Sequence, residues 1–140
     1  QVHILLKKKS IKELKEIFPK FAWDDIYNPL DIWAAVEQVG PEKAYKIAGD
    51  VLLRRKNLDY LIYYLTAIEE TEFNWKILKD FNKQYPNTAI LMGFFGGDKK
   101  LILKWREILE EQLNIPVFES ISNMFKIISK VISKRNKKYI

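Results

Sequence analysis

The sequence predicts an α/β fold, an open parallel sheet with helices on both of its faces. Short apolar, β-prone runs alternate with segments whose apolar residues recur at helical spacing. Residues 88–94 are almost continuously apolar, as expected for a strand that is buried on both faces. Strands separated by helices pair in parallel through right-handed crossovers, which gives the predicted layers.

The first half of the chain is predicted to hold two strands and two helices. Residues 2–6 are a strand candidate, and Ser10 is a predicted N-cap for the helix that follows. Residues 19–40 are predicted to form a long connection, and connections of that length are usually functional. Pro41 fits the first turn of the next helix, and residues 58–65 are strongly β-prone.

The second half continues the alternation. A helix is predicted over residues 73–81, and Tyr85-Pro86-Asn87 ends it. After the strand at 88–94 we expect a helix over 101–113, a short strand at 115–118 and a final helix from Met124 to Ile132. This order is flavodoxin-like in type.

Composition narrows the possible functions. The chain has 140 residues, 48% of them apolar, so we expect a single globular domain over residues 1–140. It has no Cys, which excludes disulfides, thiolate metal sites and thiol nucleophiles. It also lacks a Walker loop and an apolar run long enough to span a membrane. Because it begins at Gln1 and not at Met, we expect a piece of a longer polypeptide.

The net charge of +6 lies at the C-terminal end. Six basic residues and no acidic residue follow Ser120, and they account for the whole net charge: Lys126, Lys130, Lys134, Arg135, Lys137 and Lys138. They suit the negative end of a solvated helix dipole. A nucleic-acid footprint is the alternative, although such footprints usually lie along one face.

Five short motifs in order resemble one known family. Asn28-Pro29-Leu30-Asp31 looks like its Asn-Pro-Val-Asp signature, and residues 10–19 look like its short helix that ends in Leu-Pro. Residues 40–45, Leu65-Thr66 and Phe95-Gly96-Gly97 are similar to a helix start, a strand end and a Gly-Gly turn. The chain therefore resembles the C-terminal, succinyl-CoA synthetase-like domain of the nucleoside-diphosphate-forming acyl-CoA synthetases, of the ADP-forming acetyl-CoA synthetase type.

The resemblance implies a cytoplasmic acid–thiol ligase that works through an acyl phosphate and a phosphohistidine. The complete enzyme would use CoA, ATP or ADP, and Mg, none of them bound by this chain alone. Its expected partners are a CoA-binding domain, a phosphohistidine domain and an ATP-grasp domain or subunit. The family domain begins with a further strand and helix, so we expect this chain to lack the first β-α unit and to be inactive alone. Because the sheet edge is open, we also expect the missing strand to come from a neighbouring chain, from self-association, or from omitted sequence of the same polypeptide.

The resemblance offers five residues as phosphate or domain-interface candidates: Asn28, Asp31, Thr66, Gly96 and Gly97. Asp31 could instead cap a turn, and the two glycines could simply form the turn into a helix. No catalytic residue and no metal site is expected in the chain. His3, the only histidine, is interpreted as structural. The four tryptophans are interpreted as core or interface residues: Trp23, Trp33, Trp75 and Trp105.

Three classes of function stay open at this point. The first is a lobe of an acyl-CoA synthetase that supports the phosphohistidine relay. The second is a non-catalytic, synthetase-like domain that binds a ligand or a regulator, for example in a protein acetyltransferase. The third is a basic α/β domain that binds nucleic acid. We expect no membrane contact for any of the three classes.

Overall fold

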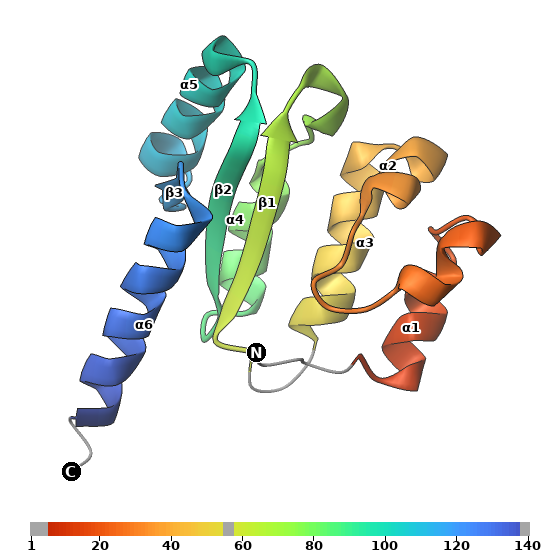
Figure 1. The fold of residues 1–140 in the computed structure, drawn as a ribbon, viewed down its shortest axis with the longest axis horizontal. Helices are drawn as coiled ribbons and strands as arrows, with labels where there is room; N and C mark the ends of the chain where they lie inside the picture. Colours follow the sequence, from red (N-terminus) through yellow and green to blue (C-terminus); the bar gives the residue numbers. More distant parts are fainter. Residues whose placement is uncertain (1–5, 55–57, 138–140) are drawn as a thin grey trace. The chain divides into compact units, whose positions relative to one another are not determined.

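The computed structural model describes residues 6–54 and 58–137 (Figure 1). They group into two compact units. The N-terminal unit comprises the chain up to Leu61 together with Glu69–Ala89, and the C-terminal unit comprises Ile62–Ile68 and the chain from Ile90 onward. The strand predicted at residues 2–6 lies outside the described residues, except for Leu6, which belongs to no helix or strand.

Helices dominate the N-terminal unit. In chain order they are α1 (Lys8–Leu14), the 3₁₀ helix η1 (Lys20–Asp25), α2 (Trp33–Val39), α3 (Pro41–Leu53), the 3₁₀ turn η2 (Glu69–Thr71) and α4 (Lys76–Gln84). Pro41 occupies the first turn of α3, as predicted. Gly40 joins α2 to α3 with φ +81°, a left-handed conformation that favours glycine.

Two predictions for this unit are wrong. Ser10 does not cap α1, because the helix already begins at Lys8 and the N–H of Ile11 bonds to the carbonyl of Lys7. Residues 19–40 are not a structureless connection, because they contain η1 and α2. Both helices are short, so their apolar spacing gives little helical signal in the sequence.

The core of the N-terminal unit is largely aromatic and aliphatic. Leu14, Ile17 and Leu78 are almost fully buried. The rings of Tyr45 and Phe73 stack with their centroids 4.6 Å apart. Such stacked pairs add about 1 kcal/mol to the burial of the rings. Residues of α1, α3 and α4 therefore share one packed core.

An ionic network joins α1, α3 and the end of α4. Arg54 pairs with Glu13, and its Nε lies 3.0 Å from the Asp50 carboxylate. The Tyr85 hydroxyl donates to that same carboxylate at 3.1 Å. These side chains are partly exposed, so each pair contributes about 1 kcal/mol or less.

The C-terminal unit contains the sheet. Its strands are β1 (Tyr60–Ala67), β2 (Ala89–Gly97) and β3 (Val117–Phe118). The first two residues of β1 and the first residue of β2 are assigned to the N-terminal unit. They lie in the order β1-β2-β3 and run in parallel (Figure 1). In the β2–β3 pair, Met92 is opposite Val117. The α/β class and the open parallel sheet are confirmed.

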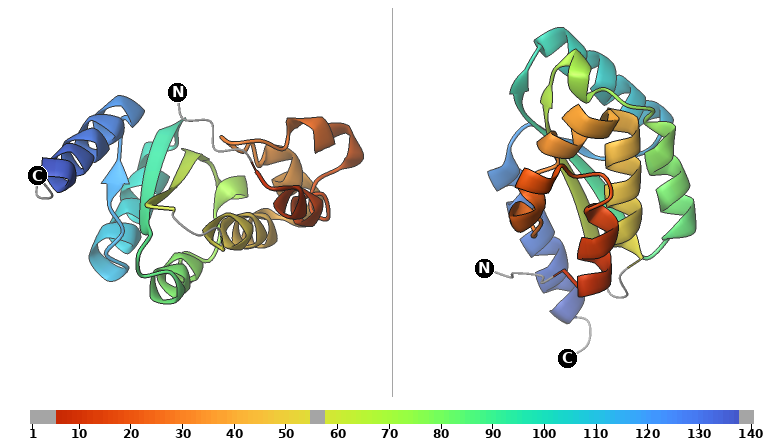
Figure 2. Two further views of the ribbon diagram at one scale, coloured as in Figure 1. Left: turned by 90° about the horizontal axis from the view of Figure 1, so that it is seen from below. Right: turned by 90° about the vertical axis from the view of Figure 1, so that its right-hand side faces the viewer.

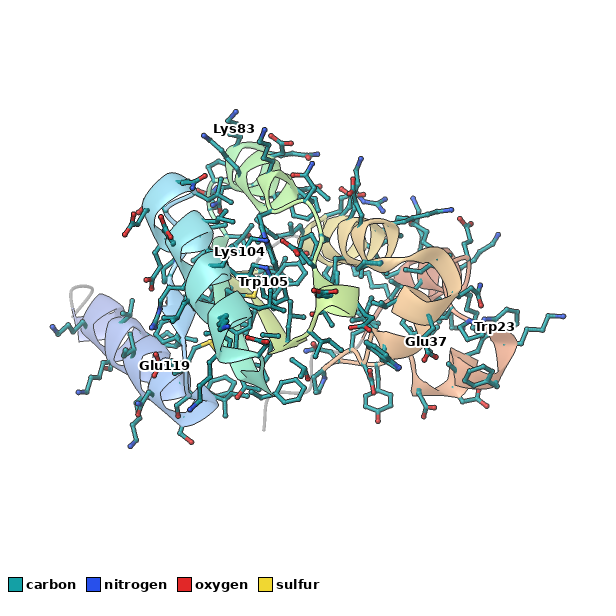
Figure 3. The ribbon with its side chains drawn as sticks, turned by 90° about the horizontal axis from the view of Figure 1, so that it is seen from above. Trp23, Glu37, Lys83, Lys104, Trp105 and Glu119 are labelled. Carbon is teal, nitrogen blue, oxygen red and sulfur yellow. The ribbon has the colours of Figure 1, made fainter. Side chains whose placement is uncertain are left out.

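Two helices lie on opposite faces of this sheet (Figure 2). They are α5 (Lys99–Glu107), which continues as a π-helical turn (Ile108–Gln112), and α6 (Ile121–Lys137). Trp105 points inward from α5 (Figure 3), and its ring centroid is 5.8 Å from that of Phe94 on β2. Met92, Leu109 and Met124 are fully buried. No helix in the described part of the chain is long and apolar enough to cross a membrane.

Tyr45 supplies a pH-dependent prediction. Burial, together with the smaller effect of the nearby Asp31 carboxylate, raises the pKa of Tyr45 from 10.0 to about 12. Between these pH values the unfolded phenol is ionised while the folded phenol stays neutral, so the folded state binds more protons. The free energy of unfolding should therefore fall by about 2 to 3 kcal/mol as pH rises from 10 to 12.

Urea unfolding of the chain and of Tyr45→Phe at a series of pH values measures this effect. The stability difference between the two proteins should be constant below pH 10 and should change above it. An identical pH dependence in both proteins would contradict the assignment.

Candidate functional site

The five predicted candidates fall into two groups. Thr66, Gly96 and Gly97 belong to the C-terminal unit, where the ends of two neighbouring strands bring them together. Asn28 and Asp31 belong to the N-terminal unit. Each group is therefore a separate candidate surface.

Gly97 lets the end of β2 approach β1 very closely. Its φ is +112°, and a Cβ atom there would meet the backbone of Ala67, the residue after Thr66. The next residue, Asp98, donates its N–H to the Ala67 carbonyl at 2.8 Å. Only glycine fits this approach without displacing backbone. The structure thus gives Gly97 the turn role that the sequence left open.

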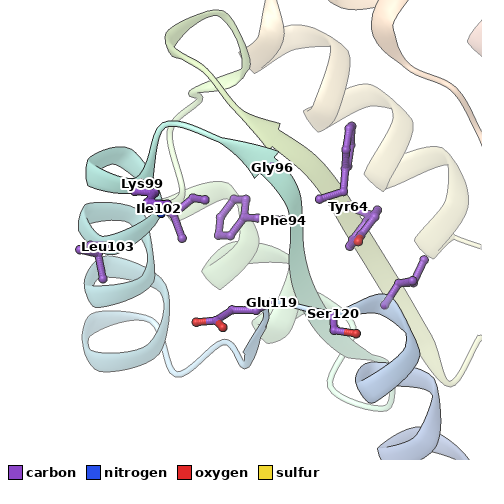
Figure 4. Close-up of a pocket in the computed structure, with 10 residues that line it drawn as sticks. Tyr64, Phe94, Gly96, Lys99, Ile102, Leu103, Glu119 and Ser120 are labelled. Carbon is purple, nitrogen blue, oxygen red and sulfur yellow. The ribbon is translucent and has the colours of Figure 1, made fainter.

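Gly96 faces open space instead. Its φ is +147°, and nothing lies within 4 Å of a Cβ built there. It lines an open hollow of about 630 Å³ beside the end of β2 (Figure 4). Phe94 and Ile102 supply apolar wall, and Lys99 and Glu119 supply charge at the rim. Clefts of this volume at strand carboxyl ends are where open α/β sheets bind ligands.

The start of α5 is already capped from within the chain. The Asp98 carboxylate accepts the N–H of Lys100 at 2.7 Å and that of Leu101 at 3.3 Å. A carboxylate at this position suits the positive end of the helix dipole but repels a phosphoryl group. The prediction of phosphate contact at the Gly-Gly turn therefore has to rely on Gly96 and Lys99. We did not identify Asp98 from the sequence, although an Asp directly before a helix is a recognisable N-cap signal.

Asp31 has a structural task in the N-terminal unit. Its Oδ1 accepts the N–H of Trp33 at 3.1 Å, and so Asp31 closes the turn that leads into α2. The side chain is exposed, while Asn28 is half-buried and precedes a cis peptide bond to Pro29. The turn role of Asp31 is thus observed, and direct substrate contact stays a prediction.

The tryptophans differ in their surroundings. Trp75 and Trp105 are buried, as a core role requires. Trp23 is half-buried; it donates from Nε1 to the Phe18 carbonyl at 3.0 Å, and the Lys15 ammonium lies 4.7 Å from its ring centroid. Trp33 is 41% exposed, which is unusual for so large a ring. Two further exposed aromatic side chains, Phe21 and Tyr27, were not predicted.

The described residues offer no site for a metal ion. Across 6–54 and 58–137, no three His, Cys, Asp or Glu side chains are grouped so that they could hold one. Bound Mg normally relies on carboxylate oxygens.

The two glycines provide a matched test of the site geometry. Gly97→Ala places a Cβ against the Ala67 backbone and should lower the free energy of unfolding by more than about 3 kcal/mol. In Gly96→Ala the new Cβ meets no atom, and only the positive φ disfavours alanine. This substitution should lower the free energy of unfolding by about 1 to 3 kcal/mol. Chemical unfolding of both variants gives the comparison. Equal costs would show that the close approach to Ala67 does not limit position 97.

One known protein resembles this chain across most of its length. The chain is 27% identical over 129 residues, or 89% of its length, to acetate–CoA ligase (ADP-forming) II of Archaeoglobus fulgidus. It spans only 18% of that protein's length. No protein-family model and no solved structure matches the chain. The distant similarity relates this chain to one part of a much longer ligase.

Proposed function

We propose that the chain is one lobe of an ADP-forming acyl-CoA synthetase, in which it supports the phosphohistidine relay without carrying the nucleophile. The observation that carries this proposal is the similarity of 89% of the chain to a single part of an ADP-forming ligase. The open parallel α/β sheet is the fold that the motif resemblance implies. The complete enzyme would convert acid, CoA and ATP to acyl-CoA, ADP and phosphate.

The chemistry of this reaction requires groups from other domains. The chain has one histidine and no Walker loop, the motif in which a Gly-rich turn followed directly by Lys and Ser or Thr cradles nucleotide phosphates. A CoA-binding domain, a histidine-bearing domain and an ATP-grasp module would hold CoA, the phosphorylated histidine, and ATP with Mg.

The lobe's own contribution would be at its two candidate surfaces. In the C-terminal unit, Gly96 exposes backbone to the hollow beside the cationic Lys99. Backbone groups and a nearby cation stabilise a phosphoryl group when they are fixed in advance. In the N-terminal unit, Asp31 presents a carboxylate on a turn that is fixed by the Trp33 N–H. These residues would position the neighbouring domain that carries the histidine.

A second candidate function is a non-catalytic lobe that binds a ligand or a regulatory partner. One observation favours it: Asp98 places a carboxylate at the start of α5 and occupies two of its N–H groups. A helix start used in this way is less suited to phosphate. The two candidates differ in whether the natural protein makes acyl-CoA.

The test uses the natural protein that contains these residues and the isolated chain. The natural protein should form acyl-CoA and ADP from acid, CoA and ATP, and the isolated chain should form neither. In the natural protein, Asp31→Asn should lower kcat about tenfold, equivalent to about 1.4 kcal/mol in the barrier. Asn retains an oxygen that can accept the Trp33 N–H, so stability should change by less than about 0.5 kcal/mol. Coupled detection of ADP and thermal unfolding measure the two effects.

Asp24→Ala is the control, because Asp24 is also an exposed Asp of the N-terminal unit. It should leave both activity and stability unchanged. Normal kcat in Asp31→Asn would show that the carboxylate serves only as a cap. A natural protein without ligase activity would favour the second candidate.

A further inference from the structure

Helix α6 presents a basic and apolar flank that the candidate site does not use. Ile127 and Val131 lie one turn apart and are 48% and 49% exposed. Lys130 and Lys134 are exposed beside them. At about 100° per residue, these four side chains fall within an arc of about 100° around the helix axis. No acidic residue lies in Ile121–Lys137, so the two lysines have no carboxylate on their own helix. We call Ile127, Lys130, Val131 and Lys134 the basic flank.

The basic flank faces away from the hollow. Met124 is fully buried and marks the side of α6 that packs against its own unit, beside β3. Ile121, which lines the hollow together with Tyr64 of β1, lies about 60° from Met124 around the axis in one direction. The basic flank lies in the other direction, at about 20° to 120° from Met124. A strand and helix added at the β1 edge would lie on the Ile121 side, so they would leave the basic flank exposed.

The N-terminal unit exposes a surface of the opposite charge. Three large aromatic side chains between residues 21 and 33 are exposed: Phe21 by 82%, Tyr27 by 58% and Trp33 by 41%. Glu37 is exposed one turn after Trp33 on α2, and Asp25 is exposed at the end of η1. Residues 20–39 contain four acidic residues and one basic residue. We call Phe21, Asp25, Tyr27, Trp33 and Glu37 the acidic surface.

The two surfaces complement each other in charge and in apolar character. Exposed aromatic rings are the side chains that most often anchor protein interfaces, and aliphatic side chains can pack on them. Opposite potentials steer two such surfaces together and fix their register. A nucleic acid or an anionic lipid surface would match the lysines alone and would leave the acidic surface unmatched. Each copy of the chain therefore offers both halves of a contact that a second copy can complete.

We propose that the basic flank of one copy binds the acidic surface of a second copy of this chain. The aliphatic pair of the flank packs on the exposed aromatic rings, and its two lysines pair with Asp25 and Glu37. Because the contact joins two different surfaces, it is head-to-tail and generates a closed ring or an open chain of copies. The inference goes beyond the proposed function and does not depend on it, since the association needs no ligase chemistry.

The experiment exchanges the charges of the two surfaces in the natural protein. Sedimentation velocity should show association that grows with protein concentration and weakens with salt, because exposed charges are screened. Lys130→Glu combined with Lys134→Glu should weaken the association by more than about tenfold, because like charges then meet. Asp25→Lys combined with Glu37→Lys should have the same effect. An equimolar mixture of the two variants should associate again, since the reversed flank then matches the reversed surface.

Lys79→Glu combined with Lys83→Glu is the matched control. These two lysines are also exposed and one turn apart, but they lie on α4. Their reversal changes the net charge by the same amount and should leave the association unchanged. The mixture also excludes a trivial loss, because a variant that failed to fold could not be rescued by its partner variant.

Four outcomes would overturn the proposal. The first is a natural protein that stays monomeric at every concentration. The second is association that survives both charge reversals, which would place the contact elsewhere, for example at the open sheet edge. The third is a mixture that does not associate. The fourth is a monomeric protein whose lysine reversal on α6 abolishes binding to anionic vesicles or nucleic acid. Ligase activity in a protein without the association would reject this inference and leave the proposed function in place.

Discussion

A parallel sheet is normally buried on both faces, and this requirement determines how the helices of the C-terminal unit pack. The two faces of its sheet differ in how completely their side chains are buried. On one face, Trp105 of α5 packs against Phe94 with no exposed surface of its own. On the other face, Met124 anchors α6 and is fully buried, while Phe125 is half exposed. Burial of a large side chain contributes about 2 to 3 kcal/mol, so leaving Phe95 and Phe125 exposed is a substantial unused gain.

Local signals in the sequence predicted much of this architecture. The apolar run at 88–94 became β2 because a strand buried on both faces needs no polar alternation. Pro41 marked the start of α3, because its fixed φ suits a first turn. Ser10 failed as a cap, since α1 began earlier at a residue without a capping side chain. The seven residues of α2 were missed, because a helix that short is stabilised mainly by packing.

The candidate site was predicted in part. Sequence motifs identified Gly96 and Gly97, and parallel pairing brought them next to the end of β1. The collision of a Cβ at Gly97 with Ala67 could not be predicted, because it depends on how closely two strands approach. The exposure of Phe21, Phe95 and other aromatic side chains was equally hidden, since a sequence gives apolar character but not the presence of a covering element.

In the proposed function, this lobe helps to position a phosphorylated histidine that belongs to another domain. The most direct test is to quench the natural protein during turnover with ATP and to locate acid-labile phosphate by mass spectrometry. The account predicts phosphohistidine at a residue outside these 140. Phosphate on His3, the only histidine of this chain, would contradict it, because the lobe would then carry the nucleophile itself.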